Sequence, residues 1–164
     1  MATAMSRVGG RVLAAAVVLG LAAAACGDGD QEAAGRPCVA VGEDLEVAAA
    51  AEVAVTLDDY SITPGTIETA AGTVTFETRN VGSQDHELAF LPGGGEVPLL
   101  ADGAPDEDAL AAAGAFELEA YGPGQRCAAT FALAPGDYTV FCVVRAPDGQ
   151  THLAKGMKGR LTVR

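Results

Sequence analysis

Alternation of apolar and polar residues from residue 52 onward constrains the fold of this chain more than any other feature. In segment 73–78 (TVTFET), Val74 and Phe76 share one face and polar side chains occupy the other. Segments with the same period lie at 52–57, 86–90, 129–133, 138–144 and 161–163. Successive side chains of a strand point to opposite faces, and turn residues such as those at 135–137 (PGD) separate the runs. The pattern therefore predicts an all-β, antiparallel sandwich of two sheets.

One segment departs from the alternation. Residues 105–113 (PDEDALAAA) begin with Pro, continue with acidic residues and are followed by Gly114. Pro and acids suit the first turn of a helix, and Gly suits the position after its end. We therefore expect one short helix on the surface of a single domain spanning residues 52–164.

The first 25 residues read as an export signal of the lipoprotein type. Arg7 and Arg11 precede an apolar or Gly run of 14 residues at 12–25, which is shorter than the roughly 20 residues of a membrane-spanning helix. The run ends in AAC at 24–26, which resembles the lipobox of bacterial lipoproteins except for Ala23, where that family usually has Leu. The resemblance implies that Cys26 is acylated and anchors the exported protein on the outer face of the cell membrane. Ordinary signal cleavage nearby, leaving Cys26 as a free thiol, is the alternative.

Residues 26–51 differ in composition from the region that follows them. They are rich in Gly, Ala and acidic residues and lack aromatic residues. Such a segment cannot bury enough apolar surface to fold alone, so we expect a flexible, acidic tether.

Charge and histidine content exclude two broad classes of protein. The formal charge of −12 argues against nucleic-acid binding, which needs a basic surface against phosphates. The chain has only 2 His, too few for an enzyme that holds several metal ions through imidazoles.

Residues able to hold a metal are concentrated near the C-terminus. Segment 142–157 (CVVRAPDGQTHLAKGM) contains Cys142, His152 and Met157, and His86 follows NVGSQD at 80–85. With the PGDY turn at 135–138 and GMKGRLTV at 156–163, residues 52–164 resemble the cupredoxins, the small single-copper electron-transfer proteins. The resemblance implies a Greek-key β-sandwich in which His86, Cys142, His152 and Met157 bind one copper ion.

The residue types support this ligand set independently, because a thiolate, two imidazoles and a weak thioether form the type 1 copper site. His86 shares a strand face with the apolar Leu88, and Cys142 shares one with Val140. Both ligands are therefore expected to point between the sheets. Nine residues separate Cys142 from His152. This spacing is longer than in plastocyanin-like or azurin-like members and is closer to the type 1 domain of copper nitrite reductases.

Ligand counts exclude two related copper architectures. A nitrite reductase needs further histidines for its catalytic copper, and a binuclear oxidase-type centre needs a second Cys beside Cys142. We therefore expect a one-electron carrier that cycles between Cu(I) and Cu(II), not an enzyme. The alternative is an extracytoplasmic copper carrier that delivers copper to an oxidase or a detoxification system, although 3 Met in all are few for such a protein. A metal-free structural domain is the third possibility.

The remaining cysteines, Cys38 and Cys127, have no place in this ligand set. In an exported protein they are expected to form a disulfide between the tether and the strand that begins near Arg126. The alternative is two unpaired thiols.

The resemblance also implies where electrons would leave the protein. The downstream histidine, His152, would reach the surface through an apolar patch formed by Pro92, Pro147, Leu153 and Ala154. A surplus of acidic residues could steer a basic partner such as a cytochrome or oxidase domain, or could serve only solubility. These acids are Asp106, Glu107, Asp108, Glu117 and Glu119.

Overall fold

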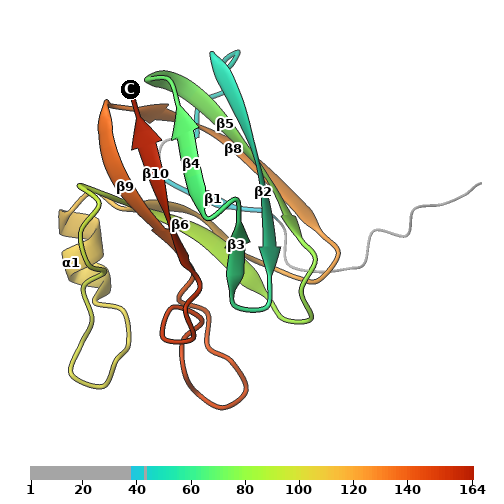
Figure 1. Ribbon diagram of the computed structural model, residues 1–164, viewed down its shortest axis with the longest axis vertical. Coiled ribbons are helices and arrows are strands. Elements are labelled where there is room, and N and C mark those ends of the chain that lie inside the picture. Colours follow the sequence, from blue (N-terminus) through green and yellow to red (C-terminus); the bar gives the residue numbers. More distant parts are fainter. Residues whose placement is uncertain (1–37, 43) are drawn as a thin grey trace, which may run out of the picture. The chain divides into compact units, whose positions relative to one another are not determined.

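Two β-sheets packed face to face form the part of the chain that the computed structural model describes, residues 38–42 and 44–164 (Figure 1). The six-stranded sheet has the order β1 (Ala40–Val41), β7 (Phe116–Tyr121), β6 (His86–Pro92), β9 (Gly136–Phe141), β10 (Lys158–Val163) and β4 (Thr66–Thr69). The four-stranded sheet has the order β3 (Ser61–Thr63), β2 (Ala51–Asp58), β5 (Gly72–Asn80) and β8 (Arg126–Leu133). The expected β-sandwich is therefore confirmed. The signal segment 1–25, Cys26 and the first part of the tether, up to residue 37, lie outside the described residues.

The core between the sheets follows the alternation of the sequence. On β5, Val74 and Phe76 are fully buried and face Phe90 of β6. The rings of Phe76 and Phe90 lie 4.5 Å apart, and Phe90 stacks on Phe116 at 4.8 Å. Each buried side chain of this size contributes about 1.5–3 kcal/mol, so the aromatic centre of the sandwich holds the strands that carry the site.

The sheets are mixed rather than purely antiparallel. β2 pairs with β5 in parallel, and β10 pairs with β4 in parallel, while the other pairs are antiparallel. A parallel pair needs a crossover connection. The chain supplies it by leaving β3 in one sheet and entering β4 in the other before it returns to β5. Local alternation does not reveal such a crossover, which is why the expectation of antiparallel pairing was incomplete.

The outer face of the six-stranded sheet is covered by the expected helix. This helix, α1 (Glu107–Ala112), begins after Asp106, whose side chain accepts a hydrogen bond from the backbone N–H of Ala109 at 3.0 Å. Leu110 packs with Leu91 and Phe141 in a second, smaller core. β6 is consequently buried on both faces, and it is the strand that begins with His86.

Part of the segment expected as tether packs on the sandwich. Ala40 pairs with Leu118 of β7, and the backbone N–H of Leu45 donates to the carbonyl of Thr130 at 2.8 Å. The packed region of the described chain thus extends ahead of residue 52. Among the residues described, no helix is long and apolar enough to cross a membrane.

The expected disulfide is present. Cys38 and Cys127 are bonded, with 5.2 Å between their Cα atoms and 89 positions between them in sequence. The bond ties the start of the packed region to β8.

Candidate metal centre

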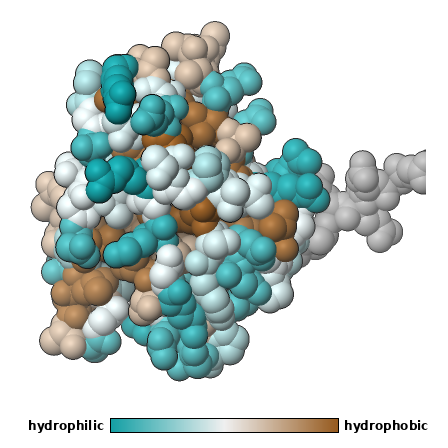
Figure 2. Space-filling model, in the orientation of Figure 1, coloured by the Kyte–Doolittle hydropathy of each residue, from teal (hydrophilic) through white to brown (hydrophobic). Residues whose placement is uncertain are grey.

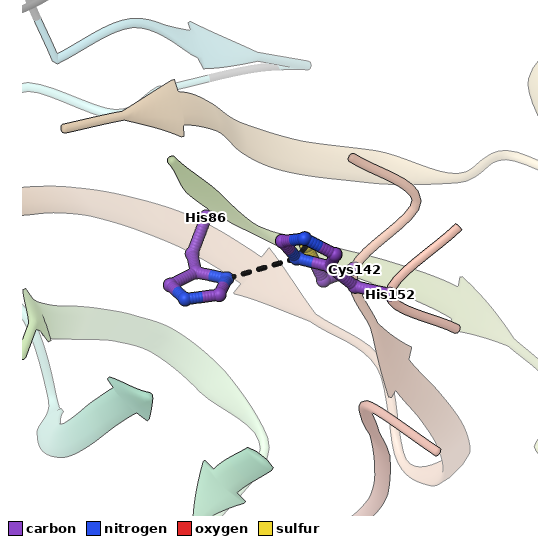
Figure 3. A group of neighbouring side chains, drawn as sticks. All are labelled: His86, Cys142 and His152. Atoms are coloured by element: carbon purple, nitrogen blue, oxygen red, sulfur yellow. Dashed lines mark hydrogen bonds between the residues drawn. The ribbon is translucent and has the colours of Figure 1, made fainter. Parts of the chain in front are cut away.

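Three side chains distant in sequence converge at one end of the sandwich (Figure 3). The Nδ1 atoms of His86 and His152 lie 3.0 Å apart, and Cys142 Sγ lies 3.4 Å from His152 Nδ1. One ligand atom from each of these three residues lies within 4.8 Å of the others. Each side chain is fully buried. They are three of the four ligands expected from the sequence.

Two of these residues lie where a strand begins or ends, and the third lies in a loop. His86 is the first residue of β6, and Cys142 directly follows β9. His152 belongs to the loop between β9 and β10, which projects beyond the sheets in Figure 1.

The nine residues between Cys142 and His152 form a compact excursion. Arg145 and Thr151 form an isolated antiparallel bridge, and the His152 N–H donates to the carbonyl of Val144 at 2.8 Å. The loop closes on itself, so its length does not carry His152 away from Cys142.

Met157, the fourth expected ligand, lies directly before β10 and is fully buried. Its N–H donates to the carbonyl of His152 at 2.9 Å, and its carbonyl accepts from the Cys142 N–H at 3.2 Å. The backbone therefore holds Met157 next to two members of the cluster, in the same buried core as Cys142.

The outward-facing nitrogens of the two imidazoles have different partners. His86 Nε2 lies 3.2 Å from Asp59 Oδ1, and His152 Nε2 lies 3.4 Å from Gln84 Oε1. Both partner atoms are hydrogen-bond acceptors. Protons placed on the two Nε2 atoms leave the lone pairs of both Nδ1 atoms directed at each other and toward Cys142.

Burial sets the protonation of the cluster in the absence of a metal. Desolvation lowers the pKa of His86, against the opposing hydrogen bond to Asp59. Desolvation and the neighbouring His86 lower the pKa of His152. Burial, together with the charge of Glu87, raises the pKa of the Cys142 thiol to about 12. At neutral pH the imidazoles are therefore neutral and the thiol keeps its proton, which a bound metal would displace.

Glu87 is a buried carboxyl beside this cluster. Burial raises the pKa of Glu87 to about 7, against a hydrogen bond that its Oε1 accepts from the Val143 N–H at 2.6 Å. Glu87 thereby holds the backbone next to Cys142.

His152, the residue through which electrons were expected to leave the protein, does not reach the surface. His152 has no exposed surface. The Tyr60 ring meets its imidazole edge-on at 5.2 Å, and Lys155 Nζ lies 5.0 Å from the centre of the Tyr60 ring. Gln84 bridges the two rings, because its Nε2 donates to Tyr60 Oη at 3.0 Å. The turn between β2 and β3, which carries Tyr60, and the loop between β5 and β6, which carries Gln84, therefore cover His152.

The apolar patch expected around His152 is only partly assembled. Leu153 and Ala154 line a cavity of about 490 Å³ together with Val97 and Leu99, whereas Pro147 lines a different one. Apolar side chains gather at the lower left of the face in Figure 2, near the loop after β6. Leu99 is 48% exposed in that loop.

The acidic residues expected to steer a partner differ in their surroundings. Asp106 caps α1. Glu107, Asp108 and Glu119 are exposed, and Glu117 is half-buried. Exposed carboxylates are thus available on α1 and β7.

Four residues around the cluster were not found from the sequence, namely Asp59, Tyr60, Gln84 and Glu87. Asp59 and Tyr60 occupy the turn between β2 and β3, and Gln84 lies in the loop before His86. Their residue types are ordinary for turns and loops, so only their placement next to the imidazoles marks them. The alternation of β6 located Glu87 on the outer face but did not indicate its burial.

Comparisons with known proteins agree with the architecture. No model of a protein family matches the sequence, and no curated protein sequence matches it. Among solved structures, auracyanin B is 23% identical, with a TM-score of 0.57 over 76% of this chain and 97% of its own. A dithionite-reduced auracyanin from the photosynthetic bacterium Roseiflexus castenholzii is 26% identical, with a TM-score of 0.54 over 71% of this chain and 99% of its own. The chain therefore has a cupredoxin-like fold.

Proposed function

We propose that this protein binds one copper ion in a type 1 site and carries single electrons between other proteins. His86, Cys142 and His152 would supply two imidazoles and a thiolate, and Met157 would supply a weak fourth ligand. Copper bound by such a donor set changes between Cu(I) and Cu(II) with little rearrangement. Water is excluded from the site by the burial of all four side chains.

The orientation of the two buried imidazoles carries this proposal. Both Nε2 atoms face acceptors, and the Nδ1 atoms of His86 and His152 lie 3.0 Å apart beside Cys142 Sγ. Two nitrogen lone pairs at this distance repel each other unless a cation or a proton lies between them. The donor types favour a metal that accepts both sulfur and nitrogen.

The visible spectrum of the purified protein with added Cu(II) tests the proposal. We expect an intense thiolate-to-copper absorption band that ascorbate bleaches and an oxidant restores. Cys142→Ser should abolish the band, whereas the matched removal of two other cysteines, Cys38→Ser with Cys127→Ser, should keep it. A band that survives Cys142→Ser would show that the ligand assignment is wrong. A colourless protein that still binds Cu(I) would favour the copper carrier.

The location of the protein forms a second part of the proposal. We propose that it is exported and held on the outer face of the cell membrane by a lipid on Cys26. The disulfide between Cys38 and Cys127 supports export, because disulfides persist outside the cytoplasm. Mass spectrometry of the membrane fraction should find an acylated N-terminal Cys26, and an unmodified N-terminus beyond Cys26 would reject the anchor.

We also propose a redox protein, such as a cytochrome or an oxidase domain, as the partner. The formal charge of −12 supports attraction to a basic surface. Electron transfer to a basic cytochrome should then slow as the salt concentration rises. A rate independent of salt would leave the acidic residues with a role in solubility only.

A further inference from the structure

We infer that Asp59 is a positioning residue that holds His86 with its proton on Nε2, so that its Nδ1 lone pair faces the metal centre. The inference rests on the proposed function in that the metal is the copper proposed above. The contact between Asp59 and His86, and the tautomer that it selects, can also be tested in the metal-free protein.

Ser83 holds both oxygens of the Asp59 carboxylate. Its Oδ1 accepts from the backbone N–H of Ser83 at 3.0 Å, and its Oδ2 accepts from the Ser83 hydroxyl at 2.5 Å. The same Oδ1 lies 3.2 Å from His86 Nε2. An ionised carboxylate only accepts hydrogen bonds, so the proton between Asp59 and His86 must belong to Nε2. This arrangement selects one tautomer of His86.

Gly82 packs tightly against this contact. A Cβ atom added to Gly82 would lie 2.6 Å from both Asp59 Oδ1 and His86 Nε2. The Gly82 N–H donates to Asn80 Oδ1 at 2.9 Å, and Asn80 is fully buried. The Asn-x-Gly turn before His86 thus forms a cradle for the carboxylate–imidazole pair, which gives Gly82 a specific reason to be glycine.

The second imidazole lacks an equivalent partner. His152 Nε2 faces the neutral amide of Gln84 at 3.4 Å, a longer contact than the 3.2 Å between Asp59 and His86. A carboxylate raises the basicity of the imidazole to which it is bonded, and outer partners of this kind orient metal-bound histidines. The two proposed histidine ligands are therefore not equivalent, since a carboxylate contacts His86 directly and a neutral amide contacts His152, on which the Asp59 charge acts without a hydrogen bond.

Two consequences follow for a bound metal. Loss of an outer hydrogen-bond partner weakens metal binding by about 10- to 100-fold. The negative charge of Asp59 also favours the more highly charged state of the metal, Cu(II), so its removal should raise the reduction potential.

The neighbouring residue provides a matched control. Asp58 is exposed, and its Oδ1 accepts from the Asp59 N–H at 2.8 Å. The side-chain amide oxygen introduced by Asp58→Asn can accept the same hydrogen bond. Asp58→Asn removes the same charge one residue away without removing a contact with His86. Comparison of Asp59→Asn with Asp58→Asn therefore separates the charge that contacts His86 from general electrostatics, and Asp59→Ala removes the hydrogen bond as well.

The experiment uses the full-length protein and three measurements. Nitrogen NMR of the metal-free protein reports which ring nitrogen of His86 carries the proton, competition with a Cu(I) chelator reports affinity, and voltammetry reports the potential. In wild type and Asp58→Asn we expect the proton of His86 on Nε2. Asp59→Ala should populate the other tautomer and lose about 10- to 100-fold in Cu(I) affinity. Asp59→Asn should keep the Nε2 proton, because its amide oxygen can still accept from Nε2. Both variants should show a raised potential.

Several outcomes would overturn the inference. His86 could keep the Nε2 proton in Asp59→Ala, or Asp58→Asn could lower affinity and raise the potential as much as Asp59→Asn. If Asp59→Ala fails to fold, Asp59→Asn still decides, because it removes the carboxylate charge with little change in packing and should raise the potential more than Asp58→Asn does. Absence of a copper band in wild type would refute the proposed function, whereas the NMR result in metal-free protein would still decide the role of Asp59.

Discussion

Removal of the disulfide should destabilise the protein by several kcal/mol. Cys38 and Cys127 are separated by 89 positions in sequence, so the bond closes a long loop in the unfolded chain. The chain-entropy relation for a loop of that size gives about 4.6 kcal/mol at 25 °C, and removal of a native disulfide from a small domain typically costs about 2–5 kcal/mol. The expected loss is therefore a large share of the stability of a domain of this size, typically about 5–15 kcal/mol.

Urea unfolding of the metal-free protein measures this loss. Cys142→Ser serves as the background, because it removes the one thiol that could exchange with the disulfide among the described residues. The same polypeptide is compared oxidised and reduced, which avoids any effect of substitution, and Cys38→Ser with Cys127→Ser provides a second comparison. A loss below about 1 kcal/mol in both comparisons would refute the assigned role of the bond, because the loop-closure argument predicts more.

Three further predictions concern the surroundings of the metal centre. Tyr60 has a φ of +66°, a conformation that costs a non-glycine residue about 1 kcal/mol. Tyr60→Gly should recover that energy but lose ring contacts worth about 1–2 kcal/mol. Unfolding free energy should hardly change, while His152 of the metal-free protein becomes open to diethylpyrocarbonate; continued protection would contradict the covering role. Gly82→Ala should weaken Cu(I) binding, because the added Cβ would meet His86 Nε2 at 2.6 Å; an unchanged chelator competition would count against the cradle. Burial raises the pKa of Glu87 from 4.5 to about 7, so folded protein binds this proton more tightly than unfolded chain. The unfolding free energy of metal-free protein should fall by on the order of 3 kcal/mol as pH rises from about 4.5 to about 7. Glu87→Gln should flatten that slope in urea titrations, and an unaltered slope would exclude Glu87 as its source.

Strand alternation was enough to predict the sandwich, and the resemblance to the cupredoxins, supported by residue chemistry, singled out three ligand candidates that lie together. Val74 and Phe76 face the core as expected, and His86 and Cys142 lie at strand ends in the same buried cluster. These predictions succeed because a period of two is a local property of the chain. The ligand set adds strong chemical restrictions, since the chain has only 2 His.

The second layer of the site could not be predicted in the same way. Asp59 contacts His86 across 27 positions, and Gln84 contacts His152 across 68. Both contacts depend on how separate loops meet at the end of the sandwich. Glu87 lies beside Ala120 of β7 and the segment that follows β9, whose Val143 N–H donates to it, and a strand pattern does not indicate this placement. Short pairings such as β1 are likewise set by the neighbouring strand and not by local pattern.

The cross-link at Cys38 also determines how the protein would respond to mechanical tension. Tension applied at the start of the described chain and at its C-terminus would pass through the cross-link to Cys127, bypassing the peptide segment between the two cysteines. With 89 positions bypassed, on the order of 300 Å of extended chain would remain hidden until the disulfide is reduced. The bypassed segment contains β1 to β7 and His86, whereas Cys142, His152 and Met157 lie on the part that still extends. A pull would therefore separate the ligands on the loop before β10 from His86 while most of the sandwich stays covalently closed.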